Sequence, residues 1–288
     1  MKAGYIALVG EPNVGKSTLF NYLLKNKLSA VSPKPQTTRN RILGILVREQ
    51  CQLCFFDTPG IITPDYPLQE NMIHQLQQAI QDADIVVWIT DPWFRSVRFP
   101  ENLAKVARTK PFIAVVNKID LADEPRVKRA LSEIASSGIS DAIALSALTG
   151  TGVEGLLSKL CDLLPENPFL YPEDDISDSP VRFFVAEIIR EKIFQKFKEE
   201  IPYSTCVQIE EYKEHEEGKD LIRAVIYVER ESQKGILIGK KGIALKRIGE
   251  AARKDIEVLI DHPVYLELWV KVKEQWRKDK KFLKEIGY

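Results

Sequence analysis

The chain has 288 residues, 44% of them hydrophobic and 28% charged, an ordinary composition for a globular protein of one large or two ordinary domains. Its 41 basic and 41 acidic residues balance, so the overall charge predicts no polyanionic partner, although a local asymmetry can hide within that average. The sequence shows no signal peptide and no run of 18 apolar residues. Cys51 and Cys54 have metal-like spacing, but no second Cys or His pair lies near them, so we expect buried thiols. We therefore expect a cytoplasmic protein with reduced thiols.

A glycine-rich segment follows the first apolar run. Residues 10–17 read GEPNVGKS and lie between a predicted buried strand at 5–9 and a predicted helix. In this context the pattern is typical of a phosphate-binding loop, whose backbone N–H groups surround an anion at a helix N-terminus. Lys16 would reach the β- and γ-phosphates, and Ser17 would coordinate Mg²⁺. The residues assigned to nucleotide binding in this loop are Gly10, Glu11, Pro12, Asn13, Val14, Gly15, Lys16, Ser17 and Thr18.

A second segment, Asp-Thr-Pro-Gly at 57–60, follows an apolar run at 53–56 that predicts a buried strand. An acid at the end of such a strand can hold Mg²⁺ through water, and the Gly60 N–H can meet the γ-phosphate. The segment alone is also compatible with a simple turn, so its weight comes from its order after the phosphate loop. The residues assigned here are Asp57, Thr58, Pro59 and Gly60.

Two later segments indicate which base is bound. The sequence NKID at 117–120 follows an apolar run, and the Asp120 carboxylate would accept two hydrogen bonds that guanine donates and adenine cannot. Lys118 would lie along the base, Asn117 would join this segment to the phosphate loop, and the Ala147 N–H would meet guanine O6. The residues assigned to guanine recognition are Asn117, Lys118, Asp120, Ser146, Ala147 and Leu148.

With these motifs in this order, the chain resembles the translation-factor-related GTPases over about residues 1–165. The resemblance implies a Ras-like, doubly wound α/β domain that binds GTP or GDP. Thr38, in the loop at 35–39, is chosen over Thr37 as a Mg²⁺ ligand on this resemblance alone, so that Ser17, Thr38 and Asp57 form the metal set. The alternative for that loop is a polar surface loop. The predicted helices span 16–26, 67–81, 99–109, 124–136 and 153–164.

The residue after the Asp-Thr-Pro-Gly segment bears on catalysis. Ras-type sites carry a water-orienting glutamine there, but here Ile61 follows, which resembles the GTPases with a hydrophobic residue at this position. Catalysis would then depend on Lys16, Thr38, Gly60 and the bound Mg²⁺. Asn13 matches an asparagine that helps to hold K⁺ in some related GTPases, and the alternative is that it only stabilises the loop. We expect a slow intrinsic GTPase.

The second half of the chain has a different order of predicted helices and strands. The first domain is predicted at 1–166, followed by a proline-rich, acidic linker at 167–180 and a second domain at 181–288. The order of helix, two strands, helix, Gly-x-x-Gly, helix and strand resembles a type II KH domain. The Gly-Lys-Lys-Gly turn at 239–242 would clamp a single-stranded sugar-phosphate backbone. The residues assigned to RNA are Ile236, Ile238, Gly239, Lys240, Lys241, Gly242, Lys246 and Arg247.

Charge and aromatic residues add to the RNA hypothesis. Residues 232–254 contain seven basic residues and one acidic residue, inside a neutral chain. Such a run is also compatible with a solvated face. Trp269 and Trp276 could stack on bases or belong to the core, and the alternating pattern around Trp269 predicts that it is core.

A guanine-nucleotide domain joined to a KH domain resembles the Era GTPases over nearly the whole chain. The resemblance implies binding near the 3′ end of small-subunit ribosomal RNA, assistance to 30S subunit maturation, and peripheral association with the inner face of the membrane; we expect a monomer. GTP and Mg²⁺ would order the loops at 30–42 and 57–75 and change the exposure of the KH domain to RNA. The alternative is an RNA-binding scaffold that senses guanine nucleotide without productive hydrolysis. A P-loop kinase is disfavoured by the motif at 117–120, and no acid–base constellation supports an RNA-modifying enzyme.

Overall fold

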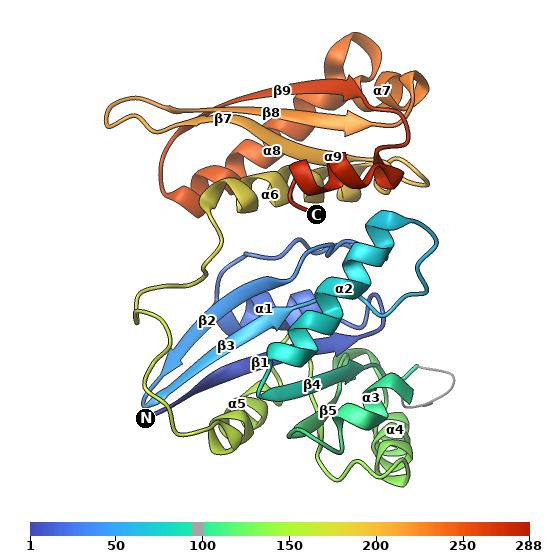
Figure 1. Ribbon diagram of the computed structural model, residues 1–288, viewed down its shortest axis with the longest axis vertical. Helices are drawn as coiled ribbons and strands as arrows, with labels where there is room; N and C mark the ends of the chain where they lie inside the picture. Colours follow the sequence, from blue (N-terminus) through green and yellow to red (C-terminus); the bar gives the residue numbers. More distant parts are fainter. Residues whose placement is uncertain (94–100) are drawn as a thin grey trace. The chain divides into compact units, whose positions relative to one another are not determined.

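The computed structural model describes residues 1–93 and 101–288, which form two compact units (Figure 1). The first unit contains residues 1–29, 38–63 and 72–178. The second unit contains residues 30–37, 64–71 and 179–288. Two short segments from the first half of the chain therefore pack within the second unit, a division that the sequence did not predict.

The first unit is built on a six-stranded sheet in the order β2-β3-β1-β4-β5-β6. Every neighbouring pair is parallel except β2 and β3, which are antiparallel. Continuous apolar runs form these strands because both faces of the sheet are covered. The strands are β1 (Lys2–Gly10), β2 (Ile42–Arg48), β3 (Cys51–Asp57), β4 (Ile85–Thr90), β5 (Phe112–Val116) and β6 (Ala142–Ala144).

Helices pack on both faces of this sheet, as a doubly wound fold requires. Buried residues of α2, α3 and α4 share one hydrophobic cluster with alternate residues of β1, and α1 and α5 contact the sheet outside that cluster (Figure 1). The helices are α1 (Lys16–Leu24), α2 (Pro67–Asp82), α3 (Glu101–Val106), α4 (Glu124–Ser136) and α5 (Val153–Leu163). The predicted α/β class is confirmed; the first two residues of the helix predicted at 99–109 lie outside the described residues.

The segment predicted as a linker is hydrogen-bonded along the first unit. The buried Gln52 side chain accepts from the backbone N–H groups of Leu170 (2.7 Å) and Tyr171 (3.0 Å) and donates to the Tyr171 carbonyl. Farther along, the Ile45 N–H donates to the Ile176 carbonyl (3.0 Å), and Ser177 Oγ donates to a β2 carbonyl. Proline and acidic content predicted a spacer, but these bonds hold much of it against the edge of the sheet.

The second unit is a three-stranded sheet in the order β7-β8-β9, with β7 antiparallel and β9 parallel to β8. Buried residues of α6, α7 and α8 form one core with the sheet. This element order agrees with the predicted KH topology. The elements are α6 (Val181–Lys196), β7 (Cys206–Lys213), β8 (Asp220–Val228), α7 (Glu231–Ile238), the 3₁₀ turn η2 (Lys240–Gly242), α8 (Ile243–Ile260), β9 (Val264–Val272), η3 (Trp276–Lys278) and α9 (Lys280–Glu285).

The prediction that Trp269 belongs to the core is wrong. Trp269 is 60% exposed, whereas Trp276 is fully buried and donates its indole N–H to the Ser204 carbonyl at 2.8 Å. In β9 the even-numbered residues Leu266 and Leu268 pack with the helices, so the odd-numbered Trp269 lies on the opposite face. The C-terminal elements bury Trp276 in a separate cluster with Cys206, Phe282 and Leu283.

No helix in the described ranges, 1–93 and 101–288, is long and apolar enough to cross a membrane.

Candidate nucleotide and RNA sites

The glycine-rich loop connects β1 to the N-terminus of α1 in the predicted strand–loop–helix arrangement. Gly15 has φ +99°, and a Cβ there would lie 2.2 Å from Asn117 Nδ2, so only glycine fits. Asn117 donates that amide to the Val14 carbonyl at 2.8 Å. The segment at 117–120 is therefore fastened directly to the loop, as a joint nucleotide pocket requires.

Lys16 is the buried cation of this loop. It is 6% exposed, and its Nζ donates to the carbonyls of Gly10 (3.1 Å) and Glu11 (2.9 Å). Burial lowers the pKa of Lys16 to about 8, against the opposing attraction of Asp57 and Glu11. A desolvated ammonium held in this way is suited to receive an anion such as a phosphate.

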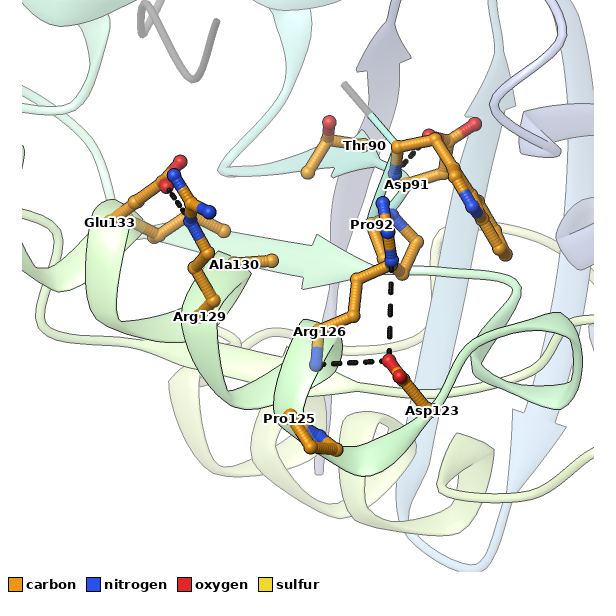
Figure 2. Close-up of a pocket in the computed structure, with 11 residues that line it drawn as sticks. Thr90, Asp91, Pro92, Asp123, Pro125, Arg126, Arg129, Ala130 and Glu133 are labelled. Atoms are coloured by element: carbon orange, nitrogen blue, oxygen red, sulfur yellow. Dashed lines mark hydrogen bonds and ion pairs between the residues drawn. The ribbon is translucent and has the colours of Figure 1, made fainter. Parts of the chain in front are cut away.

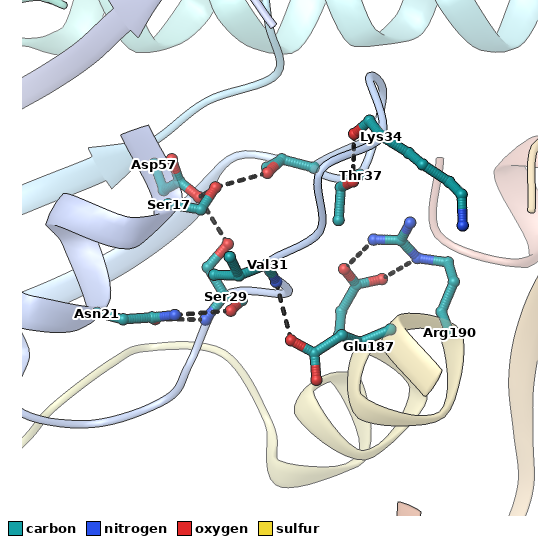
Figure 3. A network of polar contacts seen from close by, with 11 residues as sticks. Ser17, Asn21, Ser29, Val31, Lys34, Thr37, Asp57, Glu187 and Arg190 are labelled. Carbon is teal, nitrogen blue, oxygen red and sulfur yellow. Dashed lines mark hydrogen bonds and ion pairs between the residues drawn. The ribbon is translucent and has the colours of Figure 1, made fainter. Parts of the chain in front are cut away.

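Oxygen atoms from separate segments of the chain converge on the Asp57 carboxylate (Figure 3). Ser17 Oγ donates to Asp57 Oδ2 at 2.7 Å and lies 2.9 Å from Thr38 Oγ1. Ser29 Oγ donates to the same Asp57 oxygen at 2.6 Å. The predicted metal set of Ser17, Thr38 and Asp57 is thus brought together, and Ser29 is an addition that no motif signalled.

The Asp57 carboxylate shows that this cluster suits a cation. It is fully buried, and its Oδ1 has no hydrogen-bond partner among the described residues. Burial raises the pKa of Asp57, while the hydrogen bonds from Ser29 and Ser17 and the nearby Lys16 act to lower it. Hydroxyl and carboxylate oxygens are the ligands that Mg²⁺ prefers, so the residues present fit this metal.

The segment after β3 packs tightly on the phosphate loop. The buried Thr58 hydroxyl donates to the Leu8 carbonyl at 2.6 Å, and the Ile61 N–H donates to the Gly10 carbonyl at 3.1 Å. A Cβ on Gly60 would lie 2.8 Å from Pro12, so this approach also depends on glycine. The Ile61 side chain packs against the hydrophobic cluster of the first unit. Ile61 therefore has no polar group that could orient the attacking water.

The guanine segments differ in detail from the sequence-based expectation. Asp120 lies in a 3₁₀ turn and is exposed, whereas strong selection against adenine is expected of a buried carboxylate, which is costly to leave unpaired. The Ala147 N–H, which was assigned to guanine O6, donates to Asn117 Oδ1 at 2.8 Å. Lys118 adopts φ +62°, and its Nζ lies 3.1 Å from Asp91 Oδ2. The structure therefore fixes Lys118 and Asn117 internally and leaves Asp120 accessible.

A cavity of about 420 Å³ lies next to this segment, between the end of β4 and α4 (Figure 2). Its charged groups have partners: the Arg129 Nε lies 2.9 Å from Glu133, and the Arg126 Nε lies 4.0 Å from Asp123, which also caps α4 by accepting the backbone N–H of Arg126 at 3.2 Å. Asp91, which pairs with Lys118, also lines it. The charged side chains that line this cavity therefore already have partners of opposite charge, so they do not by themselves point to a charged ligand.

The Gly-x-x-Gly turn of the second unit connects α7 to α8. Gly239 and Gly242 have φ of +71° and +77°, and Lys241 between them also has a positive φ of +52°. Lys240 and Lys241 are exposed, as are Lys246 and Arg247 on the following helix. The basic residues assigned to RNA therefore lie on the solvent side of this turn and of α8.

A cavity of about 380 Å³ adjoins the turn, between α8 and β9. Leu245, Leu266 and Leu268 supply its apolar wall. Its charged lining residues are Lys246, Arg253 and Glu250; Lys246 lies 3.9 Å from Glu250, and Arg253 lies 3.1 Å from Glu257. The predicted apolar residues Ile236 and Ile238 do not line it; Ile236 is 51% exposed on α7. The assignment of Ile236 and Ile238 to RNA stays a prediction, and the alternation of β9 is the signal in the sequence that places Leu266 and Leu268 together on one face.

Comparisons with known proteins identify a GTPase domain and a KH domain. A profile described as "50S ribosome-binding GTPase" matches residues 5–118, and one described as "KH domain" matches residues 200–277. The chain is 48% identical to GTPase Era of Thermotoga maritima and 45% identical to GTPase Era of Caldanaerobacter subterraneus. Both alignments cover 100% of this chain, and they cover 97% and 98% of the relatives.

Solved structures give the same result. A single-residue variant of Aquifex aeolicus Era bound to GDP·AlF4⁻ is 40% identical, with a TM-score of 0.95. An Era complex with MgGDPNP and nucleotides 1506–1542 of 16S ribosomal RNA has the same identity and TM-score. Both matches cover 100% of this chain and 99% of the solved chain. With this similarity over its full length, and with a guanine-nucleotide pocket and a Gly-x-x-Gly turn in place, the chain belongs to the family of the Era GTPases.

Proposed function

We propose that this chain is a GTP-hydrolysing switch that binds the 3′ end of small-subunit ribosomal RNA and assists 30S subunit maturation. The observation that carries the proposal is the oxygen cluster of Ser17, Thr38 and Asp57 beside the buried Lys16, on a chain of the Era family. The RNA part is supported by the relative whose structure holds MgGDPNP together with nucleotides 1506–1542 of 16S ribosomal RNA.

In this proposal the phosphate loop positions GTP, and the chain itself supplies few reacting groups. Lys16 donates to phosphate oxygens in place of its present backbone acceptors, and the Gly60 N–H donates to the γ-phosphate. Ser17 and Thr38 would hold Mg²⁺, and Asp57 would help to hold it through its unpartnered oxygen or through water. The metal would supply positive charge that offsets the charge of the phosphate oxygens.

The intrinsic rate is proposed to be slow because Ile61 offers no group to orient the attacking water. Asn13 has φ +64°, a conformation that asparagine tolerates better than most residues, which supports a structural role in the loop. A role in holding K⁺ is the competing proposal for Asn13. GTP turnover measured in potassium and then in sodium buffer decides between them, since equal rates leave only the structural role.

For RNA, we propose that the backbone of the Gly-x-x-Gly turn clamps the sugar-phosphate chain while bases enter the cavity between α8 and β9. Lys240, Lys241, Lys246 and Arg247 would contact phosphates from the exposed side of the turn. Trp269, which is exposed on β9, is available for stacking; Trp276 is not, because it is buried.

Nucleotide state is proposed to control RNA binding through the segments at 30–37 and 64–71. Both segments belong to the second unit. Residues 30–37 lead directly into Thr38, and residues 64–71 come shortly after the Asp-Thr-Pro-Gly segment at 57–60. The experiment is the affinity for a 16S 3′-end RNA fragment in the presence of GDP and of a non-hydrolysable GTP analogue. We expect tighter binding in one of the two states; equal affinities would mean two independent modules.

Single-turnover hydrolysis of GTP separates this proposal from a scaffold that senses nucleotide without hydrolysing it. We expect complete conversion of bound GTP to GDP.

Peripheral contact with the cytoplasmic face of the inner membrane and a monomeric state are proposed from the family resemblance alone. Co-sedimentation with vesicles and light scattering test these two points.

A further inference from the structure

Asp91 and Lys118 leave neighbouring strands at the same edge of the six-stranded sheet. In the parallel pair of β4 and β5, Thr90 lies opposite Val116, and the Asn117 N–H donates to the Thr90 carbonyl at 2.8 Å. Asp91 follows directly on β4, and Lys118 comes two residues after Val116, so the sheet itself brings these two side chains together. This edge, at the carboxyl ends of the strands, is where open α/β sheets bind their ligands.

The Asp91 carboxylate is fixed by contacts on both of its oxygens. Its Oδ1 accepts the backbone N–H of Trp93 at 3.0 Å, and its Oδ2 lies 3.1 Å from Lys118 Nζ. The side chains of Asp91 and Lys118 are 20% and 31% exposed, so their attraction is screened less than that of a fully exposed pair. A carboxylate that is held by its own turn provides a stationary partner for the flexible lysine.

The backbone of Lys118 is constrained as well. Lys118 has φ +62°, in the left-handed region that lysine seldom adopts, directly before the 3₁₀ turn η1 (Ile119–Leu121). The preceding Asn117 is bound to the Val14 carbonyl of the phosphate loop. The main chain and the ammonium group of Lys118 are therefore both fixed, and its aliphatic stem runs between two anchored ends.

The phosphate loop contributes a second carboxylate near Asp91. Burial chiefly, and the charge of Asp91 after it, raise the pKa of Glu11, while Lys16 acts to lower it. The two carboxylates thus lie within electrostatic reach of each other. A substitution of Asp91 consequently changes the field at the phosphate loop as well as the position of Lys118, and a test has to separate these two effects.

We infer that Asp91 is a positioning residue for the guanine base, because it holds Lys118 Nζ so that the stem of Lys118 is already laid out along the base site. This inference rests on the proposed function, in which the chain binds guanine nucleotide and Lys118 lies along the base. A lysine side chain loses rotamer freedom when it is immobilised on a ligand, and an ion pair that is already formed reduces that loss. The benefit belongs to the base, so GDP and GTP share it.

The test is a double-mutant cycle on the Kd for GDP with Mg²⁺, measured in the full chain. Asp91→Ala should raise this Kd about fivefold more in the chain with Lys118 than in the Lys118→Met chain, which has no ammonium group to position. The general effect of removing a negative charge near the phosphate loop is present in both chains and cancels in the comparison. The same factor is expected for the GTP analogue GDPNP, since both nucleotides carry the same base. Equal effects of Asp91→Ala in the two chains overturn the inference.

Asp91→Asn separates the ion pair from the turn. The amide oxygen of asparagine still accepts the Trp93 N–H, but the amide group gives Lys118 no counter-charge. This variant should therefore show most of the Asp91→Ala defect in GDP affinity while its melting temperature stays close to that of the wild type. Normal GDP affinity in Asp91→Asn, beside a defect in Asp91→Ala, would assign the effect to the turn and contradict the inference.

Asp123→Asn is the matched control. Asp123 lines the same cavity as Asp91, but it caps α4 and lies near Arg126, and asparagine caps a helix about as well as aspartate (Figure 2). The substitution removes one negative charge, as Asp91→Asn does, and should leave the Kd for GDP at the wild-type value. A defect as large as that of Asp91→Asn would show a general sensitivity to charge at this edge, and the inference would be lost.

GDP binding and single-turnover GTP hydrolysis by the unaltered chain are measured in parallel. If this chain binds GDP and hydrolyses GTP while the cycle shows no coupling, only the role of Asp91 fails. If it binds GDP without hydrolysing GTP, the proposed hydrolysis fails and the cycle alone decides the role of Asp91. If it binds no guanine nucleotide, the proposed function fails and the inference fails with it.

Discussion

The two binding sites of this chain are constructed in opposite ways. In the first unit, Lys16 and Asp57 are buried and their polar neighbours are joined by short hydrogen bonds. In the second unit, Lys240 and Lys241 stand exposed on a turn whose shape is set by positive φ angles. Buried charges act strongly over short range and are little screened by salt, whereas exposed charges act through the ionic atmosphere of a polyanion. The difference predicts how each site responds to substitution, salt and pH.

The largest expected effect is a loss of stability on replacing Trp276. Within the second unit, this buried tryptophan contrasts with the exposed Trp269. Trp276→Ala removes a fully buried side chain and its bond to Ser204, and should destabilise this unit by about 3–5 kcal/mol. Trp269→Ala, at a 60% exposed position, should stay within about 0.5 kcal/mol. Denaturant unfolding followed by circular dichroism measures both; comparable losses would place Trp269 in a core.

Next in size is the loss of the buried cation. Lys16→Met should lower kcat/KM for GTP by about 10²–10³-fold, or about 2.7–4 kcal/mol, because a preorganised donor to the phosphates is removed. Raising the salt concentration should change the defect little. RNA affinity in the absence of nucleotide should be unaffected, which serves as the internal control. Nearly normal hydrolysis would show that Lys16 is only structural.

The exposed lysines should behave differently. Lys240→Ala combined with Lys241→Ala should weaken RNA binding and reduce the slope of log affinity against log salt by about 0.7 per lost phosphate contact. GTP hydrolysis without RNA should remain at the wild-type rate. An unchanged slope would move the RNA footprint away from the turn, and residues 271–284, where seven lysines and arginines occur, are the next place to examine.

The smallest expected effect is the change in protonation of Lys16 with pH and with nucleotide binding. The pKa of Lys16 is lowered by burial to about 8, below its usual 10.5, so the unfolded chain binds more protons between these values. The nucleotide-free protein should therefore gain stability as the pH rises from about 8 to 10.5. An adjacent phosphate favours the charged form, so GDP binding in EDTA at pH 8.5 should be accompanied by proton uptake.

Calorimetry in buffers of different ionisation enthalpy measures this proton uptake. The uptake should vanish at pH 6.5, where Lys16 is already protonated, and in Lys16→Met at either pH. Uptake that persists in the variant would assign the proton to another group.

The sequence predicts much of this molecule because its strongest signals are local. Strands buried on both faces read as apolar runs, and the phosphate loop carries its own conformational requirement in Gly15. The order of the motifs then identifies the nucleotide. Ser29 could not be found in this way, because a single serine outside any motif has no pattern, and only the fold brings it to Asp57.

The errors have a common physical origin. The period of β9 separates two faces but does not say which face another element will cover, so Trp269 was placed in the core while α9 and η3 buried Trp276. The packing of residues 30–37 with α6 joins positions about 160 apart in the chain, beyond the reach of local pattern.

The bonds between the proline-rich segment and β2 have a consequence for solubility. β2 is the outermost strand of its sheet, and an open strand edge is a template for pairing with another molecule. The N–H of Ile45 is occupied by the Ile176 carbonyl, and Ser177 covers the neighbouring carbonyl of Leu43. The segment that composition marks as a spacer therefore shields an edge from aggregation. A first domain cut at residue 166 would lose that shield, whereas one extended to residue 178 would keep it.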